Sequence, residues 1–255
     1  PLGGADNGMA PVIGGTLEER LRLADLEQAT DQINRLRSQR AETQILPGQT
    51  PGGSVVAIQS KPDKPWRLQL ATDNYGQPAT GEGRVRAAVE ADNLLGAWDA
   101  WAFNQVEARD SEAQTFSISL PFGYSTFSYA YSSSKYRLPI GSIAVSRGDA
   151  RNNILAWNHV LGRDARSRTA LDASLALRES WRRIDDIDLT PQKQAALRIA
   201  LSRQHRFASG SVSAELGATH GLDAMGADTD LPGLPGTAPH NQYEKYDFNL
   251  SAALA

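Results

Sequence analysis

Residues 115–132 read TFSISLPFGYSTFSYAYS and combine two runs of alternating apolar and polar residues with a short turn. Phe116, Ile118 and Leu120 alternate with hydroxyl side chains before the turn at residues 121–124, and aromatic residues alternate with serine and alanine after it. Successive side chains of a strand point to opposite faces of a sheet, so a period of two indicates strands. This stretch therefore predicts an antiparallel strand pair with one apolar and one polar face.

The same period continues over residues 65–255 and predicts a mainly β structure of about ten strands. Short turns alternate with longer polar connections around residues 74–83, 136–152, 182–193 and 221–244. An up-and-down transmembrane barrel has short turns at one end and long loops at the other. A soluble Greek-key sandwich has no reason to keep its long connections on one side. We therefore expect an antiparallel transmembrane β-barrel, of which this chain supplies a part.

The patterning before residue 61 is different. Residues 17–40 place hydrophobic side chains every three or four positions, which predicts a helix. Residues 41–46 and 54–59 predict two strands, separated by a turn rich in proline and glycine. Residues 17–60 are few for an independent core, so we expect them to be the C-terminal part of a small α+β domain. Residues 1–16, rich in glycine, are expected to form a flexible segment.

The composition excludes several classes of protein. Among 255 residues there are 26 basic and 29 acidic side chains, and the formal net charge is −3. A dedicated nucleic-acid binder needs a clustered basic excess, so we expect no nucleic-acid partner. The absence of cysteine excludes disulfide scaffolds and thiolate zinc sites. No apolar run approaches the roughly 18 to 20 residues of a membrane-spanning helix.

No pattern of catalytic or ligand-binding residues stands out. The histidines are scattered and lack the spacing of metal ligands. Acidic residues near 185–188 and 223–230 lack the spacing and the glycine of a calcium loop. A nucleophile elbow, a phosphate loop and a dinucleotide fingerprint are also missing. We therefore predict no catalytic residue, no metal site and no cofactor, and we expect a protein that is not an enzyme.

Three stretches together resemble one family. They are LRLADLEQ at residues 21–28 with the hairpin that follows, PWRL at 65–68 continuing to DNLLG at 92–96, and LPFGYSTF at 120–127. In this combination the chain resembles the outer-membrane transporters of two-partner secretion (TpsB-type), also called haemolysin secretion/activation proteins (ShlB/FhaC/HecB-like). Arg22 and Arg37 depart from the family pattern, in which asparagine and proline are common, and this leaves helix capping open.

The resemblance implies how the chain is organised. Residues 17–60 would be the C-terminal part of a periplasmic polypeptide-transport-associated (POTRA) domain. Residues 65–255 would be the N-terminal part of the transmembrane barrel in the bacterial outer membrane. The family's lumen-loop motif of valine, arginine, glycine and an aromatic residue is missing, so we expect a partial chain.

The resemblance also implies the function and the partners. The protein would recognise and secrete a large partner exoprotein by two-partner (type V) secretion, with activation of the exoprotein left open. Its expected partners are the extended secretion domain of that exoprotein and the lipid bilayer, and the transporter is expected to be a monomer. The alternatives are another outer-membrane barrel, either a porin or an assembly factor, and a soluble β-rich binding module.

Two groups of residues are the candidate site. A POTRA surface could bind the exoprotein by adding a strand to a sheet edge, and the candidate contacts are Leu26, Ile33, Ile45, Val55 and Ile58. Five arginines fall on polar strand faces and could line a conduit for unfolded polypeptide, or instead form a salt-bridge network inside the barrel. They are Arg67, Arg84, Arg86, Arg178 and Arg198. The five tryptophans, Trp98 among them, are expected at the membrane interfaces, with simple core packing as the alternative.

Overall fold

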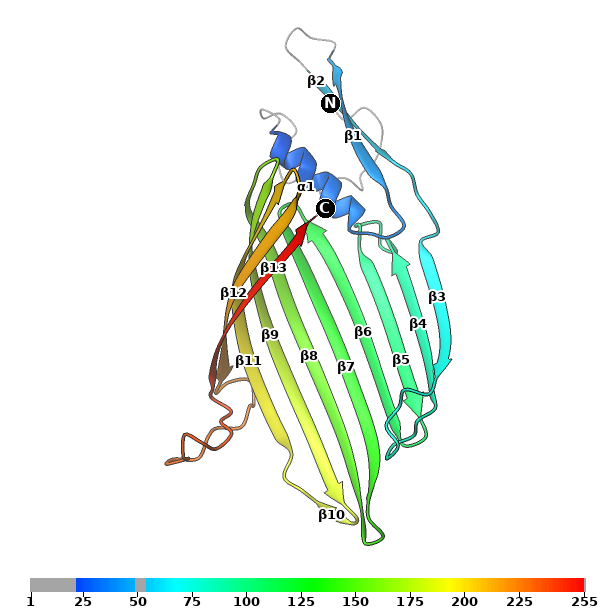
Figure 1. The fold of residues 1–255 in the computed structure, drawn as a ribbon, viewed down its shortest axis with the longest axis vertical. Helices are drawn as coiled ribbons and strands as arrows, with labels where there is room; N and C mark the ends of the chain where they lie inside the picture. Colours follow the sequence, from blue (N-terminus) through cyan, green and yellow to red (C-terminus); the bar gives the residue numbers. More distant parts are fainter. Residues whose placement is uncertain (1–21, 49–53, 255) are drawn as a thin grey trace.

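A long antiparallel sheet accounts for most of the chain in a computed structural model, which describes residues 22–48 and 54–254 (Figure 1). In chain order the elements are α1 (Leu23–Asn34), β1 (Ala41–Pro47), β2 (Ser54–Ser60), β3 (Trp66–Asp73), β4 (Arg84–Asp92), β5 (Ala100–Ala108), β6 (Ser111–Phe122), β7 (Ser125–Ile140), β8 (Ala144–Arg163), β9 (Ser167–Ile184), β10 (Ile187–Asp188), β11 (Gln192–Phe207), β12 (Gly210–Leu222) and β13 (Glu244–Leu254). No helix within these residues is long and apolar enough to cross a membrane.

The large sheet is a simple meander. Its eleven strands follow the order β13-β12-β11-β9-β8-β7-β6-β5-β4-β3, and the two-residue strand β10 pairs with β9. Neighbours in this order are also neighbours along the chain, and their pairing is antiparallel. The expected up-and-down topology is therefore confirmed. The prediction of about ten strands agrees with the ten longer strands of the sheet, and the two-residue β10 is too short to show a period.

The two faces of the sheet differ in chemistry as the alternation predicts. Phe116 pairs with Tyr131 and Leu120 with Phe127 across β6 and β7, which aligns the apolar side chains on one face. That face is solvent-exposed at large aliphatic and aromatic residues, including Leu68, Leu70, Val85, Leu155, Ile199, Leu216, Phe248 and Leu250. The opposite face holds a polar cavity that extends from β6 to β11, so this face is the concave one. Such a division suits a barrel wall with lipid outside and a polar lumen inside.

Two of the predicted loops are mostly strand. β7 continues to Ile140 and β8 begins at Ala144, so only three residues connect them where the sequence predicted a loop over residues 136–152. β9 likewise continues to Ile184, inside the predicted loop 182–193. Both faces of β8 are largely polar over residues 146–152, and at the end of β7 the apolar side chains Tyr136, Leu138 and Ile140 lie on the face that is polar along the rest of the strand. The regular contrast between the faces is therefore lost although the backbone pairing continues. This far end of the sheet therefore extends beyond the apolar band.

The first 60 residues form a helix and a hairpin as predicted, with shorter helix bounds. α1 ends at Asn34 and not at residue 40, and the start of the prediction at residue 17 lies outside the described residues. After the helix the backbone tightens, because Leu36 N–H donates to the Ile33 carbonyl, three residues earlier. Asn34 then exchanges two side-chain hydrogen bonds with the backbone of Ala41, at 2.6 and 3.0 Å, and so fixes where β1 begins. Arg22 gives no side-chain cap at the other end.

Candidate functional site: the junction between helix α1 and the sheet

Helix α1 lies across one end of the large sheet (Figure 1). Its buried glutamines Gln28 and Gln32 each donate an amide N–H to the carbonyl of Gly123, at 3.3 and 3.1 Å. The two residues are four apart and therefore share one helix face. Gly123 occupies the turn between β6 and β7 with φ +55°, a left-handed conformation that glycine adopts without strain. This backbone conformation directs the Gly123 carbonyl toward the helix.

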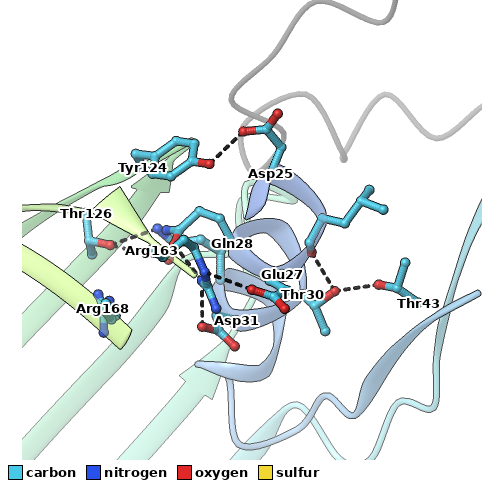
Figure 2. A network of polar contacts seen from close by, with 12 residues as sticks. Asp25, Glu27, Gln28, Thr30, Asp31, Thr43, Tyr124, Thr126, Arg163 and Arg168 are labelled. Atoms are coloured by element: carbon cyan, nitrogen blue, oxygen red, sulfur yellow. Dashed lines mark hydrogen bonds and ion pairs between the residues drawn. The ribbon is translucent and has the colours of Figure 1, made fainter. Parts of the chain in front are cut away.

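Arg163 at the end of β8 connects the sheet to the same helix. Its guanidinium donates to the Gln28 side-chain oxygen at 3.0 Å and to the Asp31 carboxylate at 2.8 Å, and Glu27 lies 3.4 Å away. Figure 2 shows this arginine reaching from the end of β8 to Glu27, Gln28 and Asp31 on the helix. Only 11% of its side chain is exposed. Arg163 thus contacts two carboxylates and one side-chain amide of α1, and these contacts hold the helix over the β8–β9 turn.

Tyr124 ties the first turn of the helix to the sheet. Its hydroxyl donates to the Asp25 carboxylate at 2.6 Å (Figure 2). Burial, followed by the hydrogen bond to Asp25, raises the pKa of Tyr124 to about 12. The tyrosine is therefore neutral at any physiological pH and can act only as a donor to this carboxylate.

The last turn of the helix contacts the β4–β5 turn. Arg35 donates to the Trp98 carbonyl at 2.6 Å and also to the Ser119 hydroxyl. The Trp98 side chain packs against the cluster of Ile33 and Ala41, which also includes Ile58 from β2. For Trp98 the core-packing alternative therefore holds and the membrane-interface prediction does not, because its side chain packs in the core of the helix–hairpin unit.

A buried carboxylate shapes the turn that carries Trp98. Asp99 is fully buried and accepts hydrogen bonds from the backbone N–H groups of Leu94, Leu95 and Ala97, at 2.9, 3.0 and 3.3 Å. The indole N–H of Trp101 is a fourth donor. Burial alone would raise the pKa of Asp99, but the hydrogen bonds from these groups outweigh it and lower the pKa. The charged form of Asp99 thus stabilises the turn.

A further contact joins the segment after the helix to the first strands of the sheet. Ser38 N–H donates to the Asp92 carboxylate at 2.9 Å, and Arg67 donates to the same carboxylate at 2.9 Å. Arg37 forms an ion pair with Glu90 at 3.0 Å. The helix–hairpin unit is therefore attached to β4, to the β4–β5 and β6–β7 turns and to the end of β8.

The predicted partner-binding residues lie in two different environments. Ile33 has no exposed surface and Leu26 is buried, so neither can touch a partner while the helix is docked. Ile45 and Val55 are exposed by 56% and 44% on the hairpin, and Ile58 is half-buried against the core. The hairpin side chains are thus the accessible part of this group.

The five predicted pore arginines occupy polar-face positions of their strands. Four of them form ion pairs there: Arg67 with Glu90 and Asp92, Arg84 and Arg86 with Asp73, and Arg198 with Glu215 and Asp247. Arg178 lines the polar cavity. These contacts favour the salt-bridge alternative for the four paired residues.

Sequence reasoning missed most of the residues that dock the helix. Gln28 belongs to the family-like stretch at residues 21–28 but was not predicted to contact the sheet, and Gln32 and Arg163 lie in no quoted motif. Two glutamines four residues apart on one helix face are the signal that points to this contact. Across residues 22–48 and 54–254, no three histidine, cysteine, aspartate or glutamate side chains gather as a metal site requires.

Comparison with known proteins identifies the family. Residues 52–255 match the model of the haemolysin secretion/activation proteins ShlB/FhaC/HecB, and residues 5–47 match the POTRA domain. The chain belongs to the haemolysin secretion/activation protein family. The family confirms the resemblance seen in the sequence and the fold class predicted from it.

Named relatives of this family agree. The chain is 33% identical over 242 residues to the outer membrane transporter CdiB of Escherichia coli O6:K15:H31 (strain 536 / UPEC), covering 91% of this chain and 41% of that protein. It is 31% identical over 219 residues to the hemolysin transporter protein ShlB of Serratia marcescens, covering 81% and 39%. The solved structure of CdiB from Escherichia coli matches with a TM-score of 0.90 at 31% identity, covering 96% of this chain and 48% of that one. The chain spans less than half the length of the curated relatives that it matches.

Membership of the haemolysin secretion/activation protein family indicates which end of the sheet faces the periplasm. The protein is an outer-membrane protein whose POTRA part lies in the periplasm. The end of the sheet under α1 is therefore the periplasmic end, and the hairpins of β7–β8 and β9–β11 lie at the opposite end (Figure 1).

Proposed function

We propose that this chain is part of a transporter that captures a large exoprotein in the periplasm and exports it across the outer membrane by two-partner secretion. The observation that carries the proposal is the docked helix α1, which is fixed to three periplasmic turns or strand ends of the barrel sheet. This attachment holds the POTRA hairpin beside the mouth of the polar face. A segment bound to the hairpin is then close to the conduit.

The hairpin has the features of a surface that binds extended polypeptide. Within the described residues β1 pairs only with β2, and it carries the exposed Ile45 and Leu46 at its end. An extended segment could add to the edge of β1 through main-chain hydrogen bonds and place successive side chains beside Ile45 on one face and beside Leu46 and Val55 on the other. Family membership favours this transport function over a porin, an assembly factor or a soluble binding module.

The remaining properties belong to the same proposal. We infer a monomeric protein in contact with lipid, because the exposed apolar face of the sheet has the composition of a lipid-facing wall. The named relatives are transporters, and we infer that this chain likewise performs no catalysis and uses no cofactor. Folding of the exported chain outside the cell would then drive transport.

Secretion with site-specific crosslinking tests the proposal. A photoreactive residue replaces Ile45 on the hairpin, and the transporter is co-expressed with a candidate exoprotein of the same bacterium. We expect the exoprotein in the medium and an adduct at position 45. The control is a photoreactive residue at Leu155, which is equally exposed but lies on the lipid-facing side. Exoprotein retained in the periplasm, or equal adducts at both positions, would refute the proposal.

A further inference from the structure

A cleft of about 430 Å³ lies between the POTRA unit and the periplasmic end of the barrel sheet. The wall from α1 and β1 is mixed: it holds the apolar Leu23, Leu26 and Ile45 together with the polar or acidic residues Glu27, Thr30, Asp31 and Thr43. The opposite wall comes from the β8–β9 turn and the end of β11 and is rich in arginine. A volume of this size is within the range of ligand-binding sites.

The strand pairing places the arginines of the β8–β9–β11 wall close to one another. Arg163 on β8 stands directly opposite Arg168 on β9. Arg206 N–H on β11 donates to the carbonyl of Arg166 at 2.7 Å, which places these two residues side by side. Like charges at opposed positions of a sheet repel each other. Glu27 and Asp31 neutralise Arg163, so the unfavourable positive charge is that of the other arginines of this wall.

The carboxylates that line the cleft are already engaged. Glu27 and Asp31 contact Arg163 (Figure 2). Asp164 accepts hydrogen bonds from the backbone N–H groups of Arg166 and Ser167, both at 2.8 Å.

Three arginines are left without a carboxylate. In the described part of the chain, no ion pair is formed by Arg166, Arg168 or Arg206, and all three are exposed. Arg168 has only a 3.4 Å contact with the Asn158 amide oxygen. The second wall of the cleft therefore offers free guanidinium groups to an anionic ligand.

We propose that this cleft binds a carboxylate-rich extended segment of the exported polypeptide, an inference that rests on the proposed function. Side chains of an extended chain alternate between two sides. A segment that alternates aspartate or glutamate with apolar residues would place its carboxylates on Arg166, Arg168 and Arg206. Its apolar side chains would lie against Leu23 and Ile45.

The position of the cleft connects capture with transport. Arg168 shares the strand face of Asp172 and Arg178, and Arg206 shares that of Arg198, all of them polar-face positions. A segment held by these arginines is therefore already at the periplasmic mouth of the polar face. The arginine wall would select acidic segments at the entrance and pass them to the lumen.

A peptide-binding assay tests the inference independently of secretion. The purified chain in detergent micelles is titrated against two fluorescein-labelled octapeptides, one alternating aspartate with leucine and one alternating asparagine with leucine. Fluorescence anisotropy at low salt should show about tenfold tighter binding of the acidic peptide. Equal affinity for the two peptides overturns the inference, and this comparison needs only the wild-type protein.

Charge variants then locate the site. The double variant Arg168→Gln/Arg206→Gln should bind the acidic peptide about tenfold more weakly, because two charge contacts are lost. The matched control is Arg203→Gln, since Arg203 is exposed near the same end of β11 but shares the face of Leu201. Unchanged binding in the double variant, or an equal loss in the control, overturns the inference. A transporter that fails to secrete but binds the acidic peptide would refute only the proposed function.

Discussion

Replacing Arg163 by alanine should loosen the POTRA helix from the barrel by about 2 kcal/mol. The partly exposed ion pairs with Asp31 and Glu27 contribute about 0.2–1 kcal/mol each, and the hydrogen bond to the Gln28 amide about 1 kcal/mol. A loss of 2 kcal/mol lowers the docking equilibrium constant about 30-fold. The undocked population should rise by the same factor.

Hydrogen exchange at the Ser38 amide measures this population. This N–H donates to the Asp92 carboxylate across the junction, so it exchanges when the helix undocks. We expect about 30-fold faster exchange in Arg163→Ala. The control Arg203→Ala removes an exposed arginine from the same end of the sheet and should leave the rate unchanged. An unchanged rate in Arg163→Ala would refute the view that this arginine holds the helix.

Three further predictions concern single side chains. Tyr124→Phe removes the hydrogen bond to Asp25 and should lower the free energy of unfolding, measured by chemical denaturation, by about 1.5–3 kcal/mol. In the wild-type protein this stabilisation should be lost between about pH 10 and 12. The reason is that the pKa of Tyr124 is raised in the folded state, so stability falls once the hydroxyl ionises. Asp99→Asn replaces a carboxylate oxygen by an NH₂ donor that faces backbone N–H groups and should lower the free energy of unfolding by about 3 kcal/mol. Since the pKa of Asp99 is lowered in the folded state, the stabilisation by the wild-type carboxylate is present above about pH 4 and is lost as the pH falls below it. Denaturant unfolding at two pH values measures this loss. Arg198→Ala leaves Asp247 without its partner inside the barrel and should raise the cation selectivity of the pore in planar bilayers, whereas an unchanged reversal potential would place this pair outside the ion pathway.

The strands were largely predictable from the sequence, and the docking contacts were not. Phe116 and Tyr129 belong to runs in which one face meets lipid and the other a polar lumen, so the period of two is visible locally. The contact between Gln32 and Gly123 joins residues 91 positions apart, and no local pattern records it. The loop predicted over residues 136–152 is strand in the structure, because the apolar side chains of β7 change face there and the start of β8 is largely polar on both faces, so the regular alternation is absent.

The sequence by itself determined the strand alternation, the order of a helix–hairpin unit before a meander, and the family. Each of these depends on neighbouring residues or on short motifs. The tertiary structure alone decided that Trp98 completes the POTRA core and that Arg163 reaches helix α1. It also decided that Arg168 and Arg206 share one cleft wall, because strand register and the docking of α1 bring together residues that are distant along the chain.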